Sequence, residues 1–194
     1  MAHAGIGRSV EGIHAVTAAL QAGRVELLSV ERGRANRDDI QSLVEQARSS
    51  GVRIDLLDDV RAVAETTAPQ GVVATCVPLK TWSLEELVAQ SSPAALLVVD
   101  HVEDPHNVGA MARSAVAAGV PRMAVSDRRS ARIGAAAFKA AAGAMEQLSL
   151  AVIGSVADAL RNLSSMGVWT VGLDAGGDRS LFGLDRLTEP GAIV

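Results

Sequence analysis

The stretch that decides the fold runs from Val99 to Val120 and is VDHVEDPHNVGAMARSAVAAGV. It continues an apolar run, residues 96–99, that has the length and composition of a buried strand. A polar loop containing Asp104-Pro105 follows, and an alanine-rich segment with the character of a helix begins near Asn107 or Val108. A strand, a loop and a helix in this order predict part of an open α/β sheet, which binds ligands at the carboxyl ends of its strands.

The start of the predicted helix carries the pattern Asn-x-Gly-x-x-x-Arg, formed by Asn107, Gly109 and Arg113. Pro105 holds Asp104 in an extended conformation, so the strand cannot continue directly into the helix. Asn107 is a good N-cap because its side-chain oxygen can accept an orphan backbone N–H. Gly109 allows another backbone or a ligand to approach closely, and Arg113 lies on the same helix face. A capped helix with a surface arginine is the plain alternative, but the density of polar residues favours a functional site.

The composition bounds the class of protein. A chain of 194 residues can bury a sizeable core and form one or two domains. Its single cysteine, Cys76, excludes an internal disulfide and lies in the apolar run 71–77, where a buried strand residue is expected. We see no signal peptide and no apolar run near the ~18 residues of a membrane span, so we expect a cytoplasmic protein without membrane contact. The four histidines are too scattered to predict a metal site.

The first part of the chain, residues 9–77, alternates predicted helices and strands. The helices are expected at residues 12–22, 38–50 and 60–66, and the strands at residues 25–30, 52–57 and 72–77. This alternation predicts a small α/β domain with a parallel or mixed sheet. Residues 78–92 form the connection and include a short helix that Ser83 caps, with Glu86 three residues later.

The second part alternates more strictly. Its strands are expected at residues 96–99, 122–125, 148–153 and 168–172, and its helices at residues 108–118, 135–142 and 156–166. Short strands that alternate with helices predict a parallel, doubly wound sheet.

A local basic patch lies downstream of Arg113, although the net charge of −4 does not itself indicate nucleic-acid binding. Asp127 is the one acidic residue within this patch. The patch can therefore contact phosphates, unless it is simply a solvated loop and helix face. The scarcity of aromatic residues, 2%, argues against reading single strands by stacking. The cations of the patch are Arg122, Arg128, Arg129, Arg132 and Lys139.

These features resemble the SpoU/TrmH family of RNA ribose 2′-O-methyltransferases, within the SPOUT superfamily. The first motif of that family carries an asparagine and an arginine at the catalytic pocket, which match Asn107 and Arg113. Residues 10–16 (VEGIHAV) and 70–74 (QGVVA) resemble the small substrate-binding domain of the ribosomal-RNA subgroup, and residues 141–146 (AAGAME) resemble a further family segment. The resemblance implies an RNA-binding domain at residues 1–77, a linker at 78–92 and a SPOUT (α/β knot) methyltransferase domain at 93–194.

The resemblance also implies an activity. The enzyme would transfer a methyl group from S-adenosylmethionine to a ribose 2′-hydroxyl, in a guanosine of the large-subunit 23S rRNA, and would act as a homodimer. Arg113 would activate the hydroxyl, Asn107 would orient Arg113 or the ribose, and Glu103 would position either through an ion pair or remain a solvated loop carboxylate. Leu173 would line the adenosine side of the methyl donor, unless residues 173–177 form an ordinary glycine-rich turn. In the first domain, RNA selectivity is expected from Arg8, His14, Arg32, Arg34 and Arg37.

Two further family motifs follow the strand that begins here at Gly191, so they would fall beyond Val194. In the family they thread the knot and build most of the S-adenosylmethionine pocket. We therefore expect a methyltransferase domain that is incomplete at its C-terminus and that, alone, holds the methyl donor weakly. A shortened form of a longer enzyme and a protein that binds RNA without catalysis both remain open. A different α/β nucleotide-binding domain is disfavoured by the Asn-x-Gly-x-x-x-Arg pattern.

Overall fold

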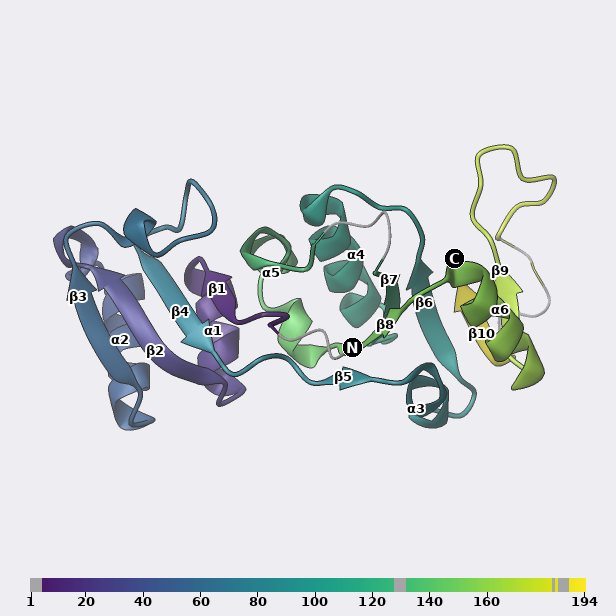
Figure 1. Cartoon of the computed structure of the whole chain (residues 1–194), viewed down its shortest axis with the longest axis horizontal. Coiled ribbons are helices and arrows are strands. Elements are labelled where there is room, and N and C mark those ends of the chain that lie inside the picture. Colours follow the sequence, from purple (N-terminus) through teal and green to yellow (C-terminus); the bar gives the residue numbers. More distant parts are fainter. Residues whose placement is uncertain (1–4, 128–131, 183, 185–188) are drawn as a thin grey trace. The chain divides into compact units, whose positions relative to one another are not determined.

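The structure is a computed structural model that describes residues 5–127, 132–182, 184 and 189–194. The chain forms two compact units (Figure 1). Unit 1 contains Met1–Leu79, Asp104–Arg113 and Arg132–Gln147, and unit 2 contains Lys80–Glu103, Ser114–Ala131 and Leu148–Val194. Helix α4 (Pro105–Ala117) is therefore divided between the two units.

Unit 1 is built on a four-stranded mixed sheet, sheet A, with strand order β1-β4-β2-β3. Strands β2 and β3 are parallel, and β4 is antiparallel to both β1 and β2. Two amphipathic helices contribute core residues such as Val16, Leu20, Ile40 and Leu43. The elements are β1 (Ser9–Glu11), α1 (Ile13–Gln21), β2 (Val25–Glu31), η1 (Arg32–Arg34), α2 (Asp38–Ser49), β3 (Arg53–Leu57), η2 (Val60–Ala62) and β4 (Val72–Cys76).

A buried carboxylate shapes the loop between η2 and β4. Glu11 is fully buried and accepts hydrogen bonds from the backbone N–H of Glu65 (2.5 Å) and of Thr66 (3.2 Å), and from the Thr66 hydroxyl. These bonds hold the chain in a loop, so the helix predicted over residues 60–66 is wrong beyond the single 3₁₀ turn of η2. Strand β1, which supplies Glu11, was too short for the sequence pattern to predict.

Cys76 is confirmed as a buried strand residue. It lies in β4 with no exposed surface. Burial raises the pKa of its thiol to about 12, so the thiol stays protonated under ordinary conditions. A reactive cysteine needs a thiolate, and Cys76 is therefore an inert core residue.

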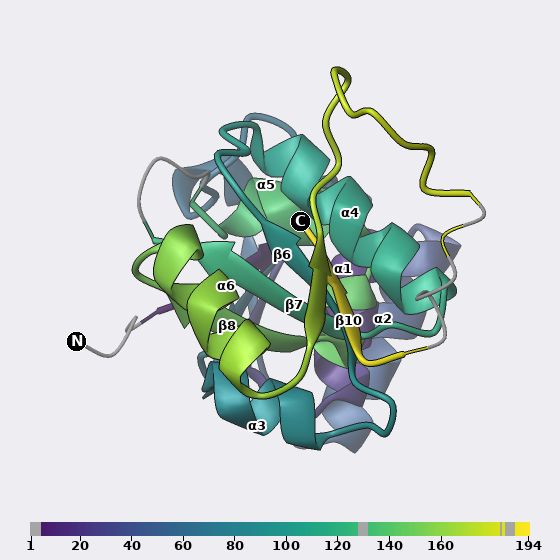
Figure 2. The ribbon, with the colours of Figure 1, turned by 90° about the vertical axis from the view of Figure 1, so that its right-hand side faces the viewer.

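Unit 2 is built on sheet B, whose six strands are all parallel, in the order β5-β8-β7-β6-β10-β9 (Figure 2). The predicted parallel α/β architecture is confirmed. The strands are β5 (Thr81–Trp82), β6 (Ala95–Val99), β7 (Arg122–Ser126), β8 (Ser149–Ile153), β9 (Trp169–Val171) and β10 (Gly191–Ile193). Strands β7 and β8 lie on one side of β6, and β10 and β9 lie on the other. This change of side at β6 creates a switch point.

One apolar cluster joins sheet B to α3 (Leu84–Ala89) and α6 (Val156–Ser165). Leu87 and Leu163, from the two helices, are fully buried in the cluster that also contains Leu96 and Val98 of β6. The predicted cap of α3 is confirmed: the Ser83 hydroxyl accepts from the Glu86 N–H (3.1 Å), and the Glu86 carboxylate accepts from the Ser83 N–H (2.7 Å).

A buried ion pair links distant parts of unit 1. The Arg24 guanidinium donates to both carboxylate oxygens of Glu146, at 2.7 and 2.5 Å, and the two side chains are only 11% and 5% exposed. The same guanidinium donates to the carbonyls of Gly7 (3.1 Å) and Val77. Burial opposes the charge of Arg24, but the hydrogen bond and charge of Glu146 outweigh it, and the pKa of Arg24 is raised.

The first half of α4 lies very close to α5 (Ala135–Ala141), which is followed by the 3₁₀ turn η3 (Ala144–Gln147). A Cβ atom on Gly109 would lie 2.5 Å from the carbonyl oxygen of Ala137 and 2.7 Å from the Cβ of Ala140. The small side chains of α5 and the absence of one at Gly109 therefore allow the backbones to approach. This confirms the expected close approach at Gly109, with a helix backbone as the neighbour.

We predict that Gly109→Ala destabilises the protein. Alanine favours a helix over glycine by about 1 kcal/mol, but overpacking against a backbone costs roughly 1–3 kcal/mol, and the carbonyl of Ala137 cannot move without shifting α5. Thermal unfolding should show a lower Tm for this variant. Gly33→Ala is the control, because nothing lies within 4 Å of a Cβ at Gly33. Equal Tm values for the two variants would contradict the close-approach argument.

Candidate functional site

The start of α4 is fixed by Asp104 and Pro105. The Asp104 carboxylate accepts the backbone N–H of His106 (2.8 Å), and its carbonyl accepts the N–H of Asn107 (3.1 Å). Pro105 is the first helical residue, a position that needs no N–H donor. The prediction of Asn107 as the N-cap is therefore wrong: Asp104 caps the helix, and Asn107 belongs to its first turn.

Asn107 and Arg113 are both exposed on the part of α4 that belongs to unit 1. Across the part of the chain that the structure describes, the Arg113 guanidinium has no hydrogen bond or ion pair. Gly109, between them, is buried against α5. The glycine of the motif is thus structural, while its asparagine and arginine keep polar groups accessible.

In unit 2, a polar segment follows the carboxyl end of β6. His101 has a positive φ of 51°, and its Nδ1 lies against the Asp100 carboxylate. Such backbone conformations are uncommon outside glycine and cluster at functional sites. Glu103 follows, is exposed, and has no hydrogen bond or ion pair within the described residues.

The register of sheet B brings the end of β9 to the same edge as the end of β6. Ile193 of β10 pairs with Leu97 of β6 on one side and with Val171 of β9 on the other. Leu173 follows β9 and donates its N–H to the carbonyl of Val194 (2.8 Å). The chemistry-bearing loops after β6 and β9 therefore leave the sheet at the same edge, with β10 between the two strands.

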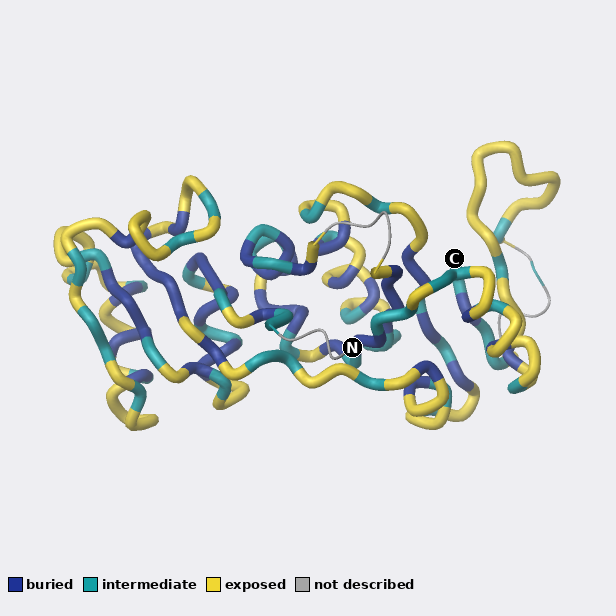
Figure 3. Tube along the Cα trace, viewed as in Figure 1, coloured by how far each residue is buried: buried dark blue, intermediate teal, exposed yellow. Residues whose placement is uncertain are grey.

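Leu173 lines a cavity of about 510 Å³ that the loop after β9 encloses. Leu173 is 58% exposed, and residues 172–180 are exposed throughout (Figure 3). The wall combines apolar Val171 and Leu181 with polar Asp174 and Arg179. A cavity of this size and mixed lining suits a ligand that has both apolar and polar parts.

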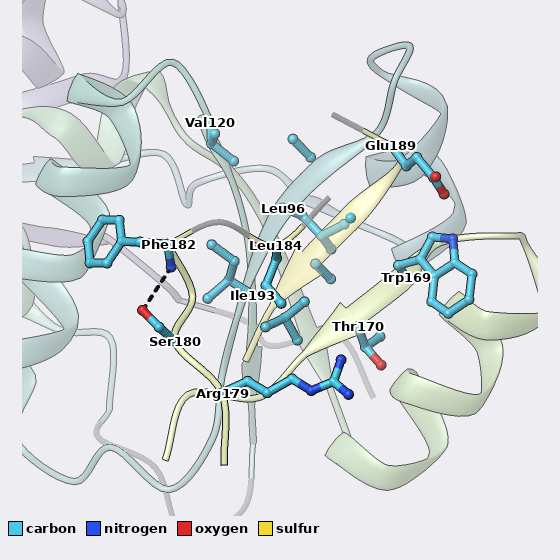
Figure 4. A pocket seen from close by; sticks show the side chains of 14 residues that line it. Leu96, Val120, Trp169, Thr170, Arg179, Ser180, Phe182, Leu184, Glu189 and Ile193 are labelled. Carbon is cyan, nitrogen blue, oxygen red and sulfur yellow. Dashed lines mark hydrogen bonds between the residues drawn. The ribbon is translucent and has the colours of Figure 1, made fainter. Parts of the chain in front are cut away.

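A second cavity, of about 650 Å³, lies over strands β6, β10 and β9 (Figure 4). Leu96 and Ile193 form its apolar floor, with Trp169 and Arg179 at its sides. Trp169 is 48% exposed and Phe182 is 90% exposed. Sequence reasoning missed this cavity, because alternating strand residues predict only which side chains face the core.

Topology divides the RNA-binding residues that were predicted in unit 1. Strands β1, β2 and β3 run in the same direction, so the segments that follow them meet at one edge, here called the carboxyl edge of sheet A. Four of the predicted RNA-binding residues lie at this edge and are exposed: His14, Arg32, Arg34 and Arg37. Arg8 precedes β1 and is at the opposite edge, where its carbonyl accepts the N–H of Cys76.

The predicted basic patch is also divided. Arg122 donates from Nε to the carbonyl of Ala95 (2.7 Å), and Lys139 donates to the carbonyl of Ala68. Arg132 is exposed. The other two predicted members, Arg128 and Arg129, lie outside the described residues.

Two kinds of feature are absent from the described ranges. No helix there combines the length and apolar character needed to cross a bilayer. No group of three or more His, Cys, Asp or Glu side chains there is arranged to hold a metal ion.

Solved structures define the class of the fold. The AdoMet-bound SpoU methyltransferase AviRb from Streptomyces viridochromogenes superposes with a TM-score of 0.72 at 20% identity, over 95% of this chain and 70% of that one. An rRNA methyltransferase from Sinorhizobium meliloti gives a TM-score of 0.71 at 20% identity, over 96% and 70%. The fold is that of the SpoU methyltransferases.

Family comparison is more specific. Residues 94–194 match the SpoU rRNA Methylase family, and residues 9–82 match the domain described as RNA 2′-O ribose methyltransferase substrate binding. The chain belongs to the SpoU rRNA methylase family. S-adenosylmethionine is the methyl donor of this family.

Curated relatives carry related names. The 23S rRNA (guanosine-2′-O-)-methyltransferase RlmB of Pseudomonas aeruginosa is 38% identical over 95% of this chain and 77% of its own length. The tRNA/rRNA methyltransferase slr0955 of Synechocystis, described as uncharacterized, is 34% identical over 94% of this chain. The chain spans 49% of the length of slr0955, about half.

We predict that the cap formed by Asp104 fixes the start of α4. Asp104→Ala should cost about 0.5–2 kcal/mol of unfolding free energy, because the N–H of His106 loses its acceptor. Asp104→Asn keeps a side-chain oxygen at the same place and should cost only a fraction of that. Urea unfolding of the two variants measures the difference, and equal losses would show that the side-chain bond does not stabilise the helix.

Proposed function

We propose that this protein transfers a methyl group from S-adenosylmethionine to the 2′-hydroxyl of a ribose in RNA, and that the target is a guanosine of 23S rRNA. The observation that carries the proposal is the start of α4, where Asn107 and Arg113 are exposed on either side of the buried Gly109. This segment lies within the match to the SpoU rRNA Methylase family. The target is the one in the names of the RlmB relatives, which are 32–38% identical to this chain.

Arg113 is our candidate for activation of the hydroxyl. A ribose hydroxyl is a poor nucleophile that must lose its proton during attack. A guanidinium remains protonated in proteins, so Arg113 acts by polarising the hydroxyl or by holding the adjacent phosphate. Asn107 orients Arg113 or the ribose. Glu103, which is exposed and has no ion pair within the described residues, is the candidate that positions them.

We assign the adenosine side of the methyl donor to Leu173. The cavity beside Leu173 has a volume of about 510 Å³ and contains apolar side chains together with Asp174 and Arg179, so the residues present fit such a ligand. S-adenosylmethionine, when bound, supplies a methyl group carried on a positively charged sulfur. Val171 and Leu173 form the apolar part of that wall.

We assign RNA binding to two regions. At the carboxyl edge of sheet A, His14, Arg32, Arg34 and Arg37 contribute selectivity. In the second region, Arg132 and its neighbours in sequence hold phosphates near the reacting ribose, and such contacts raise affinity without reading the base sequence. Arg8 lies at the opposite edge of sheet A and is proposed as a separate contact with the RNA. The second region is proposed to comprise Arg128, Arg129, Arg132 and Lys139. Arg122, the first residue of β7, donates to the carbonyl of Ala95 and is a separate candidate contact.

The division of labour along the chain is also a proposal. Residues 1–77 select the RNA, residues 78–92 connect the two domains, and residues 93–194 carry out the transfer. The first family match ends at residue 82 and the second begins at residue 94, which supports this boundary.

We further propose that the protein works as a homodimer in the cytoplasm. Sedimentation equilibrium tests the dimer, and a single species of 20.0 kDa would refute it.

We predict that Arg113→Ala abolishes methyl transfer. Loss of one donor to a developing oxyanion lowers the rate by about 10²–10³-fold, whereas the fold should be unaffected because Arg113 is exposed. The measurement is transfer of a labelled methyl group to 23S rRNA, with Arg161→Ala on α6 as the exposed-arginine control. A wild-type rate in the Ala variant would remove Arg113 from the mechanism. RNA binding without methyl transfer in the wild type would overturn the proposed activity.

We predict that removing the arginines of the carboxyl edge weakens RNA binding. The triple variant Arg32→Ala/Arg34→Ala/Arg37→Ala should bind 23S rRNA less tightly and with a shallower salt dependence, by about 0.7–0.9 in the logarithmic slope for each phosphate that is no longer bound. Arg8→Ala removes one exposed charge from the opposite edge and should change binding less. Filter binding across a salt series tests both. Equal decreases in affinity for the two proteins would contradict the assignment of this edge.

A further inference from the structure

The carboxyl edge of sheet A carries four arginine–carboxylate pairs. All four arginines are exposed, and each lies within 3.2 Å of a carboxylate oxygen, so the four pairs have no net charge. A surface that contacts phosphates usually has an excess of positive charge. The pairs are Arg32–Asp58 (3.2 Å), Arg34–Glu31 (3.2 Å), Arg37–Asp39 (2.7 Å) and Arg61–Asp59 (2.8 Å).

The pair between Arg32 and Asp58 joins two loops, because it connects the segment after β2 to the segment after β3. Its side chains are 62% and 94% exposed. Exposed pairs of this kind are weak and exchange readily. Arg32 also donates to the carbonyl of Leu56 (3.4 Å), so its guanidinium has a second anchor that does not depend on Asp58.

The neighbouring carboxylates are ionised under ordinary conditions. The hydrogen bond from Arg37 lowers the pKa of Asp39, and the hydrogen bond from Arg61 lowers the pKa of Asp59. An RNA phosphate that approaches these arginines therefore meets a negative charge already in place. Binding must either displace that carboxylate or accept its repulsion.

We propose that the carboxylates of this edge, above all Asp58 and Asp59, compete with RNA phosphates for the edge arginines and so limit the binding of non-cognate RNA. This inference rests on the proposed RNA-binding function. An RNA that places several phosphates at the spacing of the arginines replaces all the carboxylates at once. An RNA that reaches one arginine at a time gains little, because each contact only exchanges one anion for another.

In this arrangement, the carboxylates make the binding of non-cognate RNA unfavourable and so discriminate between RNAs. Arginines alone would bind any polyanion, and affinity for random RNA would rise with their number. With a carboxylate at each arginine, the general electrostatic attraction is cancelled while the guanidinium groups remain in position. Selectivity is then set by the geometry of the RNA backbone and not by the total charge of the surface.

The test replaces the competing carboxylates without changing their shape. Asp58→Asn and Asp58→Asn/Asp59→Asn should bind a short random-sequence RNA more tightly, by about two- to five-fold for each substitution, with a steeper dependence on salt. Asn at residue 59 keeps the side-chain oxygen that accepts the N–H of Arg61 (2.9 Å), so the η2 turn is preserved. Affinity for 23S rRNA should rise less, so the preference for 23S rRNA should fall.

Asp158→Asn is the matched control, because Asp158 also forms an exposed pair with an arginine, Arg161 on α6. It changes the net charge by the same amount and should leave both affinities unchanged. The proposal is overturned if Asp58→Asn leaves random-RNA affinity the same or lowers it, or if Asp158→Asn raises it equally. If the arginine triple variant loses RNA binding while the aspartate variants bind as the wild type does, the carboxyl edge is still an RNA-binding surface, but the proposal that its carboxylates compete with phosphates is rejected.

Discussion

Unit 1 depends on the buried ion pair between Arg24 and Glu146. The pair joins residues 122 positions apart in the sequence, and the Arg24 guanidinium also binds the carbonyls of Gly7 and Val77. Removing one partner of a buried pair leaves an uncompensated charge and costs about 3–5 kcal/mol. Glu146 belongs to η3, which follows α5, and α5 is the helix against which Gly109 packs. The positions of Asn107 and Arg113 within unit 1 therefore rest on an interaction far from them in the chain.

Elements with a strong apolar period could be predicted from the sequence, and α1, α2, α6 and strands β6, β7, β8 and β9 are examples. Strand β5 has only two residues, Thr81–Trp82, and was missed. The prediction of a secondary-structure element failed where a side chain distant in the sequence determined the local structure. Residues 60–66 have helical character, but the buried Glu11 binds the backbone of Glu65 and Thr66 and holds a loop. At α4 two capping residues competed, and Asp104 prevailed because the proline after it is already shaped for the first helical turn.

The candidate site shows the same limit. Motif spacing located Asn107, Gly109 and Arg113 on one helix, since spacing within a helix is a local property. Motif spacing could not show which edge of sheet A each basic residue occupies, because the direction of the strands places Arg8 and Arg32 at opposite edges. Nor could it show that the arginines of the carboxyl edge have carboxylate partners, as the partner of Arg32 lies 26 residues away. A set of cations in a sequence is therefore a weak guide to the electrostatic potential of a surface.

The distribution of a few rare side chains has a practical consequence for optical work. Both tryptophans, Trp82 and Trp169, belong to unit 2, and the chain contains no tyrosine. Intrinsic fluorescence therefore reports on unit 2, and unfolding of unit 1 alone would pass almost without a signal. The single thiol, Cys76, is buried in unit 1. A thiol-reactive dye and tryptophan emission thus observe different halves of the molecule, and a difference between their transitions would reveal whether the halves unfold together.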